Sequence, residues 1–212
     1  MPSGFTTASC RLQHVLVRVL VLVLVLASPL TAFAQSAYPG THPDPASQVD
    51  PFLGTGGHGH TFPGATMPFG MVQVSPDAGT SGWDWCSGYH ASDSAVIGFS
   101  HTHLSGTGCA DLGDVLLLPT TSTNTLDRRW RTPYDHAHEE ASPGYYRVLL
   151  SDGIEVQLGA SRRCGVQLYS FPAADSMLVV LDLGYGQDDR PTGCRLTVGS
   201  DTLLTGYRYS TG

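Results

Sequence analysis

Residues 50–119 decide the fold, and they read DPFLGTGGHGHTFPGATMPFGMVQVSPDAGTSGWDWCSGYHASDSAVIGFSHTHLSGTGCADLGDVLLLP. Five of the chain's nine histidines and two of its three tryptophans lie in this stretch, separated by many glycines. A glycine-rich backbone that gathers aromatic, imidazole and carboxylate groups is typical of a binding or catalytic surface. We therefore expect loops that carry the functional site here, and a scaffold in the remainder of the chain that holds them.

Composition limits the class of protein. The chain has 212 residues, of which 41% are hydrophobic, and this is enough for one sizeable domain with a packed core. The formal net charge is -7, and all 11 basic residues are arginines. A nucleic-acid partner requires a basic face that neutralises phosphates, so the acidic balance argues against nucleic-acid binding.

The N-terminus has the pattern of a secretory signal peptide. Two arginines precede an apolar run at residues 19–26, and an A-x-A cleavage site ends at Ala34. The run is too short for a comfortable membrane span, and an uncleaved anchor is the alternative. We expect a signal peptide over residues 1–34, export to the periplasm or extracellular space, and no stable membrane association. Residues 35–49, rich in Pro, Ser and Ala, are expected to form a flexible leader.

Residues 50–212 are expected to form one all-β domain, an antiparallel β-sandwich. Short runs with the two-residue alternation of half-buried strands recur between turns rich in Gly, Pro, Asp and Ser. The expected strands are residues 71–74, 95–99, 115–118, 145–150, 154–158, 166–171, 177–181, 196–198 and 202–204, with another that begins at 207. No convincing amphipathic helix of three turns follows the leader.

Local residues refine this pattern. Pro119 is expected to end the strand at 115–118, and Asp152 with Gly153 is expected to form a hairpin turn because both positions tolerate positive φ. The run 177–181 is apolar throughout, which predicts a central strand covered on both faces. Because the chain ends within an apparent strand pattern, we also expect that it is a fragment truncated at its C-terminus.

Trp83, Asp84 and Trp85 form a dense candidate site, and His90 follows them closely. A sugar stacks its C–H face on a flat aromatic ring, while its hydroxyls need donors and acceptors such as imidazole and carboxylate. The alternative is that one tryptophan belongs to the core. Since Trp is seldom fully buried, we expect at least one of the two to be partly exposed.

Two H-x-H pairs and two nearby carboxylates suggest a different site, made of His58, His60, His101, His103, Asp111 and Asp114. In a strand the two imidazoles of such a pair share one face, which suits a zinc ion. The alternative is that these histidines hydrogen-bond the backbone in tight loops or contact a polar ligand. H-x-H alone is a weak signal, so we assign no metal ligand in this chain.

Three long motifs carry a resemblance to a known family: DPFLGTGGHGHTFPGATMPFGMVQVSPD, GWDWCSGYH and GFSHTHLSGTGCADLGDVLLLP. They resemble the N-terminal domain of glycoside hydrolase family 92, and the likeness extends from Val49 to the end of the chain. The family implies calcium-dependent, inverting exo-α-mannosidases that trim chiefly α-1,2 linkages. It also implies an N-terminal β-sandwich packed on a C-terminal (α/α)6 barrel, with the active site between them.

The resemblance also implies how the site is divided. Inverting hydrolysis needs one carboxylic acid for the leaving oxygen and one carboxylate for the attacking water. Both carboxylates, and most calcium ligands, are expected in the barrel, whose sequence is absent here. We therefore assign no catalytic residue to this chain, and expect it to be inactive alone and to form one wall around a mannose-containing glycan.

Motif position suggests which side chains form this wall. Trp83 is the candidate contact for the terminal mannose, with Trp85 as the alternative. The other candidates, which either hydrogen-bond sugar hydroxyls or brace the loops that do, are Asp84, His90, His101, His103 and Asp111.

Four cysteines remain after removal of the signal peptide, namely Cys86, Cys109, Cys164 and Cys194. An even number in an exported chain permits disulfides in three pairings, and buried free thiols are the alternative. Cys86 and Cys109 lie in the two densest motifs, and we predict that they pair. Closing this loop would contribute about 3–4 kcal/mol in the chain-entropy model. No C-x-x-C pair indicates zinc.

Three functions remain open from the sequence. The first is the N-terminal domain of an exported α-mannosidase with calcium as its cofactor. The second is a carbohydrate-binding β-sandwich module that stacks mannose without cleaving it. The third is a small metallohydrolase that uses the H-x-H pairs.

Overall fold

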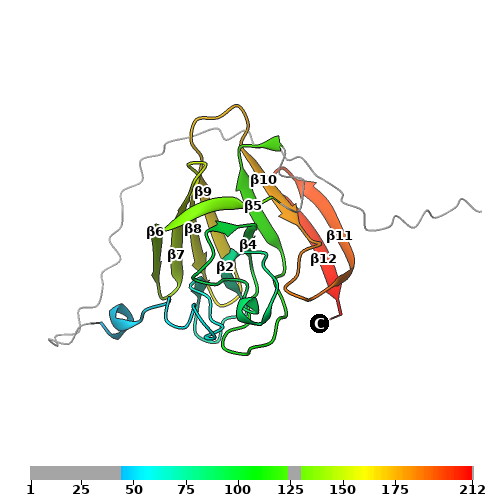
Figure 1. The fold of residues 1–212 in the computed structure, drawn as a ribbon. Helices are drawn as coiled ribbons and strands as arrows, with labels where there is room; N and C mark the ends of the chain where they lie inside the picture. Colours follow the sequence, from blue (N-terminus) through cyan, green and yellow to red (C-terminus); the bar gives the residue numbers. More distant parts are fainter. Residues whose placement is uncertain (1–43, 124–129, 212) are drawn as a thin grey trace, which may run out of the picture.

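The computed structural model describes residues 44–123 and 130–211, and in these residues it has strands and two short 3-10 turns but no α-helix (Figure 1). The strands are β1 (Ala65–Thr66), β2 (Gln73–Asp77), β3 (Ala95–Val96), β4 (Gly98–Ser100), β5 (Leu116–Thr120), β6 (Thr132–Ser142), β7 (Tyr145–Leu150), β8 (Glu155–Ala160), β9 (Gly165–Ser170), β10 (Leu178–Asp182), β11 (Pro191–Ser200) and β12 (Leu203–Ser210). The turns are η1 (Pro45–Gln48) and η2 (Trp83–Trp85). The all-β prediction is confirmed.

Two antiparallel sheets face each other and form the sandwich. One has the strand order β1-β2-β4-β5-β10, and the other has the order β3-β6-β7-β8-β9. Strands β11 and β12 form a separate two-stranded ribbon beside β10 (Figure 1). Every strand pair in the described residues is antiparallel, as the sequence predicts.

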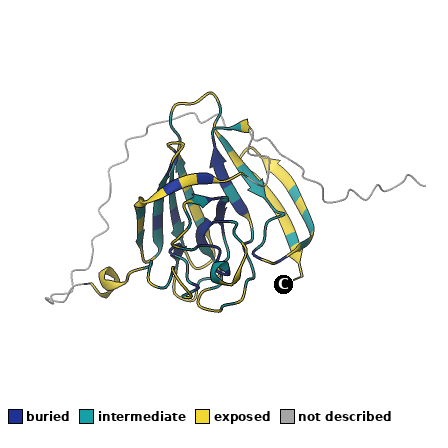
Figure 2. Cartoon of the chain, viewed as in Figure 1, coloured by how far each residue is buried: buried dark blue, intermediate teal, exposed yellow. Residues whose placement is uncertain are grey.

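The core lies between the two five-stranded sheets, where Figure 2 shows the buried residues. Alternate residues of the central strands point inward, which is why β7 and β8 show every second side chain buried. The inward side chains are Val74, Phe99, Tyr146, Val148, Leu150, Val156 and Leu158. Each buried Val or Leu side chain contributes about 1.5–3 kcal/mol, so this layer supplies much of the stability of the domain.

The hairpin between β7 and β8 confirms both strands and the turn at Asp152 and Gly153, and it shows that only Gly153 has a positive φ. Gly153 has φ +84°, whereas Asp152 is not among the residues with positive φ. The Gly153 N–H donates to the Leu150 carbonyl at 2.9 Å, and the Leu150 N–H donates to the Ile154 carbonyl at 2.9 Å. The loop therefore has three residues and closes on a left-handed glycine, which is a different solution from a two-residue turn.

The expected single strand at 95–99 is divided between the two sheets, which is a correction. β3 pairs with β6 in one sheet, and β4 pairs with β2 and β5 in the other. The change occurs at Ile97 and Gly98, and Gly98 has φ +155°. A Cβ on Gly98 would lie 2.8 Å from the Leu117 carbonyl oxygen, so only glycine fits where the chain crosses between sheets.

Two further expectations are wrong, one about where β5 ends and one about the place of β10 in its sheet. Pro119 does not end its strand but lies within β5, opposite Val179 of β10. On its other side β4 pairs with β5 only at Phe99 and Leu117, so Pro119 has no ladder partner in β4. β10 is the last strand of its sheet rather than a central one, and Val179 is 42% exposed.

β6 is an eleven-residue strand that the sequence pattern does not predict. Its register against β7 shifts between Tyr134 and Glu139, so a bulge interrupts the alternation that would reveal a strand. Glu139 nevertheless turns into the core, where its carboxylate accepts hydrogen bonds from the Tyr146 hydroxyl at 2.5 Å and the Tyr89 hydroxyl at 3.1 Å. These bonds satisfy a buried charge that would otherwise be costly.

The N-terminal predictions are only partly within the described residues. The signal peptide and the cleavage site near Ala34 lie outside them, as does most of the leader. The described end of the leader forms the exposed turn η1, which Asp44 caps by accepting a hydrogen bond from the Ala46 N–H at 3.1 Å. In the part of the chain that is described, no helix is long and apolar enough to cross a membrane.

Candidate functional site

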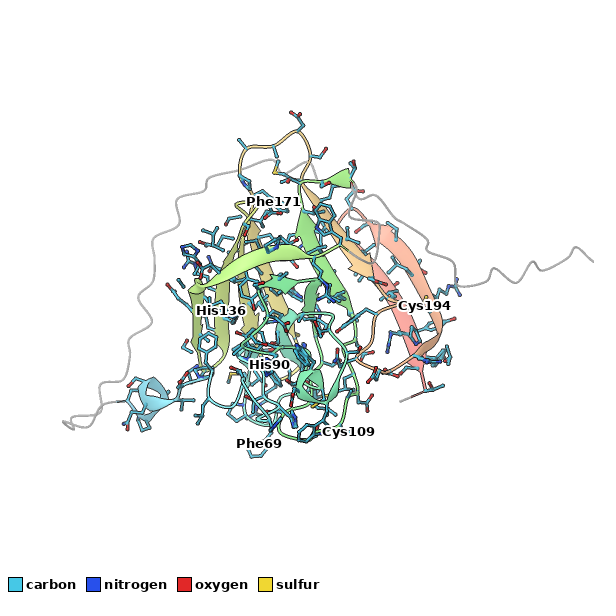
Figure 3. The ribbon with its side chains drawn as sticks, in the orientation of Figure 1. Phe69, His90, Cys109, His136, Phe171 and Cys194 are labelled. Carbon is cyan, nitrogen blue, oxygen red and sulfur yellow. The ribbon has the colours of Figure 1, made fainter. Side chains whose placement is uncertain are left out.

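The glycine-rich stretch forms loops that gather at one end of the sandwich, the lower end in Figure 1. Backbone hydrogen bonds tie these loops together: the Gly106 N–H donates to the His60 carbonyl at 2.6 Å, and the Ala91 N–H donates to the Thr55 carbonyl at 2.9 Å. Figure 3 labels His90 and Cys109 in this region. We call this end of the molecule the loop surface.

Trp83 and Trp85 lie on the short turn η2 and not on an extended segment. Gly82 precedes this turn with φ +138°, and a Cβ there would approach the Trp85 ring at 3.4 Å. Because the turn is helical, its first and third side chains point in different directions. Trp83 is 59% exposed and Trp85 is half-buried, so the prediction that at least one is partly exposed is confirmed.

Asp84 lies between two imidazoles on the loop surface. His58 Nδ1 lies 2.6 Å from Asp84 Oδ1, and His60 Nε2 lies 3.7 Å from the same oxygen. The hydrogen bond with His58 is the main reason that the pKa of Asp84 is lowered. Asp84 is therefore held ionised, with one oxygen bound to protein and the other available to accept from a ligand.

The Trp83 ring is supported by the same histidines. The His60 ring meets it edge-on at a centroid distance of 4.3 Å, and the His58 ring lies at 5.1 Å. A Cβ on Gly108 would lie 3.2 Å from Trp83 Nε1, so glycine is needed for the close approach of that loop. The result is an exposed indole face in a fixed position beside an ionised carboxylate, which is the arrangement that sugar stacking requires.

Trp85 and His90 bond to the protein instead of facing outward. Trp85 Nε1 donates to Asp93 Oδ2 at 2.7 Å. His90 uses both ring nitrogens, with Nδ1 at 2.7 Å from the Ser92 hydroxyl and Nε2 at 3.1 Å from the Gly57 carbonyl. These contacts place both side chains where they brace the loop surface.

His103 is buried beneath the loop surface, where it joins the carboxylate of Asp77. His103 Nε2 lies 3.2 Å from Asp77 Oδ1, and His103 Nδ1 lies 2.9 Å from the Gln73 carbonyl. Burial would lower the pKa of His103, but the charge of Asp77 and its hydrogen bond outweigh burial and raise it. This position braces the loops from within the core.

His101 and Asp111 also take bracing positions. His101 Nδ1 lies 2.9 Å from the Val115 carbonyl, and the ring is half-buried. Asp111 Oδ1 accepts from the Leu112 N–H at 2.7 Å, and Leu112 has φ +70°. Of the seven candidate residues, Trp83 and Asp84 thus form the outward-facing pair, and the other five lie where they hold loops.

These features coincide with a known family. The sequence profile of the glycosyl hydrolase family 92 N-terminal domain matches residues 48–212. The chain belongs to this family. We refer to the described region from here on as the family 92 domain.

Solved structures agree with this assignment. An α-mannosidase of family 92 from Bacteroides thetaiotaomicron, solved in complex with mannoimidazole, is 36% identical with a TM-score of 0.74, and the match covers 79% of this chain and 23% of that one. A family 92 glycosyl hydrolase named ccman5 is 30% identical with a TM-score of 0.70, covering 80% and 25%. An inverting mannosidase from B. thetaiotaomicron is 28% identical with a TM-score of 0.61, covering 77% and 22%.

A curated protein is also similar to this chain. A protein of Arthroderma benhamiae described as an uncharacterized secreted glycosidase is 29% identical over 169 residues, which cover 73% of this chain and 22% of the relative. This chain therefore spans about a quarter or less of the length of the proteins it matches.

The family 92 domain does not supply a metal centre from the residues described. In residues 44–123 and 130–211, no three His, Cys, Asp or Glu side chains are placed to hold a metal ion. The H-x-H pairs diverge: His58 and His60 face Asp84, whereas His101 and His103 bond to different partners. These residues do not fit a resident calcium site.

Cys86 and Cys109 lie at the loop surface but remain thiols in the structure. Cys86 is buried and Cys109 is exposed. Burial raises the pKa of the Cys86 thiol, and the backbone of the adjacent Gly108 opposes this with a hydrogen bond. The disulfide between Cys86 and Cys109 stays a prediction.

Sequence reasoning did not recognise His58 and His60 as partners of Asp84. Their H-x-H spacing suggests metal ligands instead. The signal that could have placed them is the glycine on each side of them, since Gly57 and Gly59 allow the tight loop that turns both rings toward the tryptophan turn. In this loop Gly57 has φ +57°, and a Cβ on Gly59 would collide with the Gly54 carbonyl oxygen at 2.0 Å.

Proposed function

We propose that the complete protein is an exported, calcium-dependent, inverting exo-α-mannosidase that acts chiefly on α-1,2 linkages, and that this domain forms one wall of its sugar site. The observation that carries the proposal is the exposed Trp83 ring beside the ionised Asp84. The indole stacks on the C–H face of the terminal sugar, and the free carboxylate oxygen of Asp84 accepts from a sugar hydroxyl.

The chemistry of bond cleavage is assigned to a C-terminal domain. An inverting enzyme needs two carboxyl groups about 6.5–9.5 Å apart, one protonated and one ionised. In this domain Asp84 is assigned to sugar binding and Asp111 bonds to the neighbouring backbone N–H, so the two catalytic carboxyl groups are expected in the C-terminal domain. The role of this domain is therefore to bind and orient the sugar against the catalytic carboxylates.

The relatives support the reaction class and the location. One solved relative is named an inverting mannosidase, another was solved with mannoimidazole, and a curated relative is described as a secreted glycosidase. Export also follows from the predicted signal peptide over residues 1–34. In this proposal calcium would stabilise charge at the sugar when bound, and its ligands would come mainly from the C-terminal domain.

Mannose release from defined α-linked disaccharides by the full-length protein tests the proposal. We expect release from the α-1,2 disaccharide, inversion at the anomeric carbon by NMR, and loss of turnover with a calcium chelator that added calcium restores. Mannose binding without turnover would instead favour a carbohydrate-binding module. Turnover that survives the chelator but needs zinc would overturn the calcium assignment.

Replacing Trp83 tests the role of this domain in the complete enzyme. Trp83→Ala removes the stacking face, so we expect kcat/KM on α-mannosides to fall about tenfold or more, with Trp83→Phe losing less. The control is Trp130→Ala, because the Trp130 indole donates to Thr132 beside β6 instead of facing the loop surface. An unchanged kcat/KM in Trp83→Ala would remove the residue from the sugar site.

A further inference from the structure

Gln187, in the loop between β10 and β11, makes hydrogen bonds to the turn that carries Trp83 and to the loop after Gly108. Its side-chain Nε2 donates to the Trp85 carbonyl at 2.6 Å, at the end of the turn η2. Its backbone N–H donates to the Leu112 carbonyl at 2.8 Å, in the loop that follows Gly108. One residue that is distant in sequence thus joins the tryptophan turn to the neighbouring loop.

The orientation of the Gln187 amide is set by a buried network. The Tyr185 hydroxyl lies 2.8 Å from Gln187 Oε1 and 3.2 Å from Asp77 Oδ1. Because Oε1 faces a hydroxyl donor, Nε2 is left to donate to the Trp85 carbonyl. Gln187 is 6% exposed and Asp77 is fully buried, so water does not compete effectively for these bonds.

Arg208 of β12 holds the Gln187 loop in place from the other side. Its guanidinium donates to the Tyr185 carbonyl at 2.9 Å and to the Asp189 carbonyl at 3.1 Å, and it forms ion pairs with Asp114 and Asp189. A Cβ on Gly186 would lie 2.0 Å from the Asp189 carbonyl oxygen, so the loop is folded tightly around these contacts. These contacts hold the backbone on both sides of Gln187, independently of the side-chain bond to the tryptophan turn.

We propose that Gln187 is a positioning residue that sets the place of the Trp83 ring on the loop surface. It does not touch the sugar, because it is buried beneath η2. It links the Trp85 carbonyl to the Leu112 carbonyl, and so links the turn that carries Trp83 to the loop that contains Gly108, which approaches the Trp83 ring. The role in sugar binding rests on the proposed function, whereas the hold on the tryptophan turn does not.

The test uses the full-length protein labelled with 5-fluorotryptophan, with resonances assigned by single Trp→Phe substitutions. Gln187→Met keeps the volume and the backbone bond to Leu112 but removes the side-chain bonds. We expect the Trp83 and Trp85 fluorine resonances to shift and broaden while that of Trp130 stays in place. We also expect the Kd for methyl α-mannoside to rise at least fivefold, and KM to change more than kcat.

The matched control is Gln157→Met, since Gln157 of β8 also makes two side-chain hydrogen bonds, to Tyr145 and Glu155, away from the loop surface. Gln187→Glu is a second variant that keeps the shape of the side chain but replaces the amide donor with a carboxyl oxygen, which also introduces an ionisable group near Asp77. It is expected to move the same two resonances, so the test does not depend on one substitution folding well.

The outcomes separate the two proposals. If Gln187→Met and Gln187→Glu leave the Trp83 and Trp85 resonances in place, the positioning role is overturned whatever the sugar does. If these resonances move but the unmodified protein binds no mannoside, the positioning role stands and the proposed function fails. If they move and the mannoside Kd is unchanged, Gln187 does not position the ring for sugar and the inference is wrong.

Discussion

A single oxygen of Asp84 remains available on the loop surface, because His58 occupies the other. A hydrogen bond from a sugar hydroxyl to a charged group is worth about 1.5–3 kcal/mol when it is shielded from water. We therefore expect Asp84→Asn in the full-length protein to raise the Kd for methyl α-mannoside about tenfold or more. Titration calorimetry checks this, with Asp135→Asn on the exposed bulge of β6 as the control. Equal affinities for both variants would contradict a contact between Asp84 and the sugar.

The buried pair of His103 and Asp77 predicts a pH dependence of stability. The pKa of His103 is raised in the folded state. Its contribution is therefore fully present below the unfolded value of about 6.5, and is lost as pH rises through the higher folded-state value. Urea midpoints at pH 6, 7 and 8 should fall with rising pH in the unmodified domain, and fall less in His103→Gln. Parallel slopes for the two proteins would show that this pair does not titrate in the range.

At the scale of single residues, the side chains that face outward could be predicted from the sequence, whereas the residues that hold them in place could not. Trp83 and Asp84 stand out in sequence because aromatic and acidic side chains are adjacent in a glycine-rich stretch. Gln187 gives no such signal, because a lone glutamine after a strand has no local pattern and its partners lie far away in sequence. His103 is conspicuous in an H-x-H pair, but only the fold reveals its partner Asp77.

The crossing from β3 to β4 depends on the absence of a side chain at Gly98. Gly98→Ala would place a Cβ 2.8 Å from the Leu117 carbonyl oxygen and 2.9 Å from Leu116 Cδ1. With the unfavourable φ added, we expect the free energy of unfolding to fall by about 1–3 kcal/mol. Gly159→Ala in β8 is the control, because nothing lies within 4 Å of its Cβ position. Equal urea midpoints for the two variants would show that the crossing tolerates a side chain.

Elements were predictable where burial alternates and a turn marks the end. β7 and β8 meet both conditions, and their bounds agree closely with residues 145–150 and 154–158. β6 fails the first condition, because its bulge exposes consecutive polar residues. The expectation for β10 failed for a different reason. An apolar run identifies a strand, but it does not show whether neighbouring strands lie on both sides of it.

The whole domain presents an unusually apolar ribbon. The exposed large side chains of β11 and β12 are Val198, Leu203, Leu204, Tyr207 and Tyr209. A two-stranded ribbon is marginally stable without packing on a face, and exposed apolar patches promote association. We expect the isolated chain to associate with rising concentration in light scattering, and less so with Leu203→Thr and Tyr207→Thr combined. Association that is indifferent to both changes would place the contact elsewhere.

At the scale of the molecule, the fold class could be predicted from local patterns, whereas the proposed division of the sugar site between two domains could not. Alternation and turn residues are local properties, so the ten strands expected from the sequence already indicate an antiparallel sandwich. A site that two domains share has no local signature. It became visible only through the resemblance of long motifs, such as the one containing Trp83, to a family with a second domain.

The step from β3 to β4 also constrains how the chain folds. Ile97 stands alone between a strand of one sheet and a strand of the other, and its N–H donates to the Asp77 carbonyl at 2.8 Å. The same short segment contributes β3 to one sheet and β4 to the other. These pairings join segments that are distant in sequence, which raises the contact order, and we expect this to slow folding. Probes placed in the two sheets should report the same single rate.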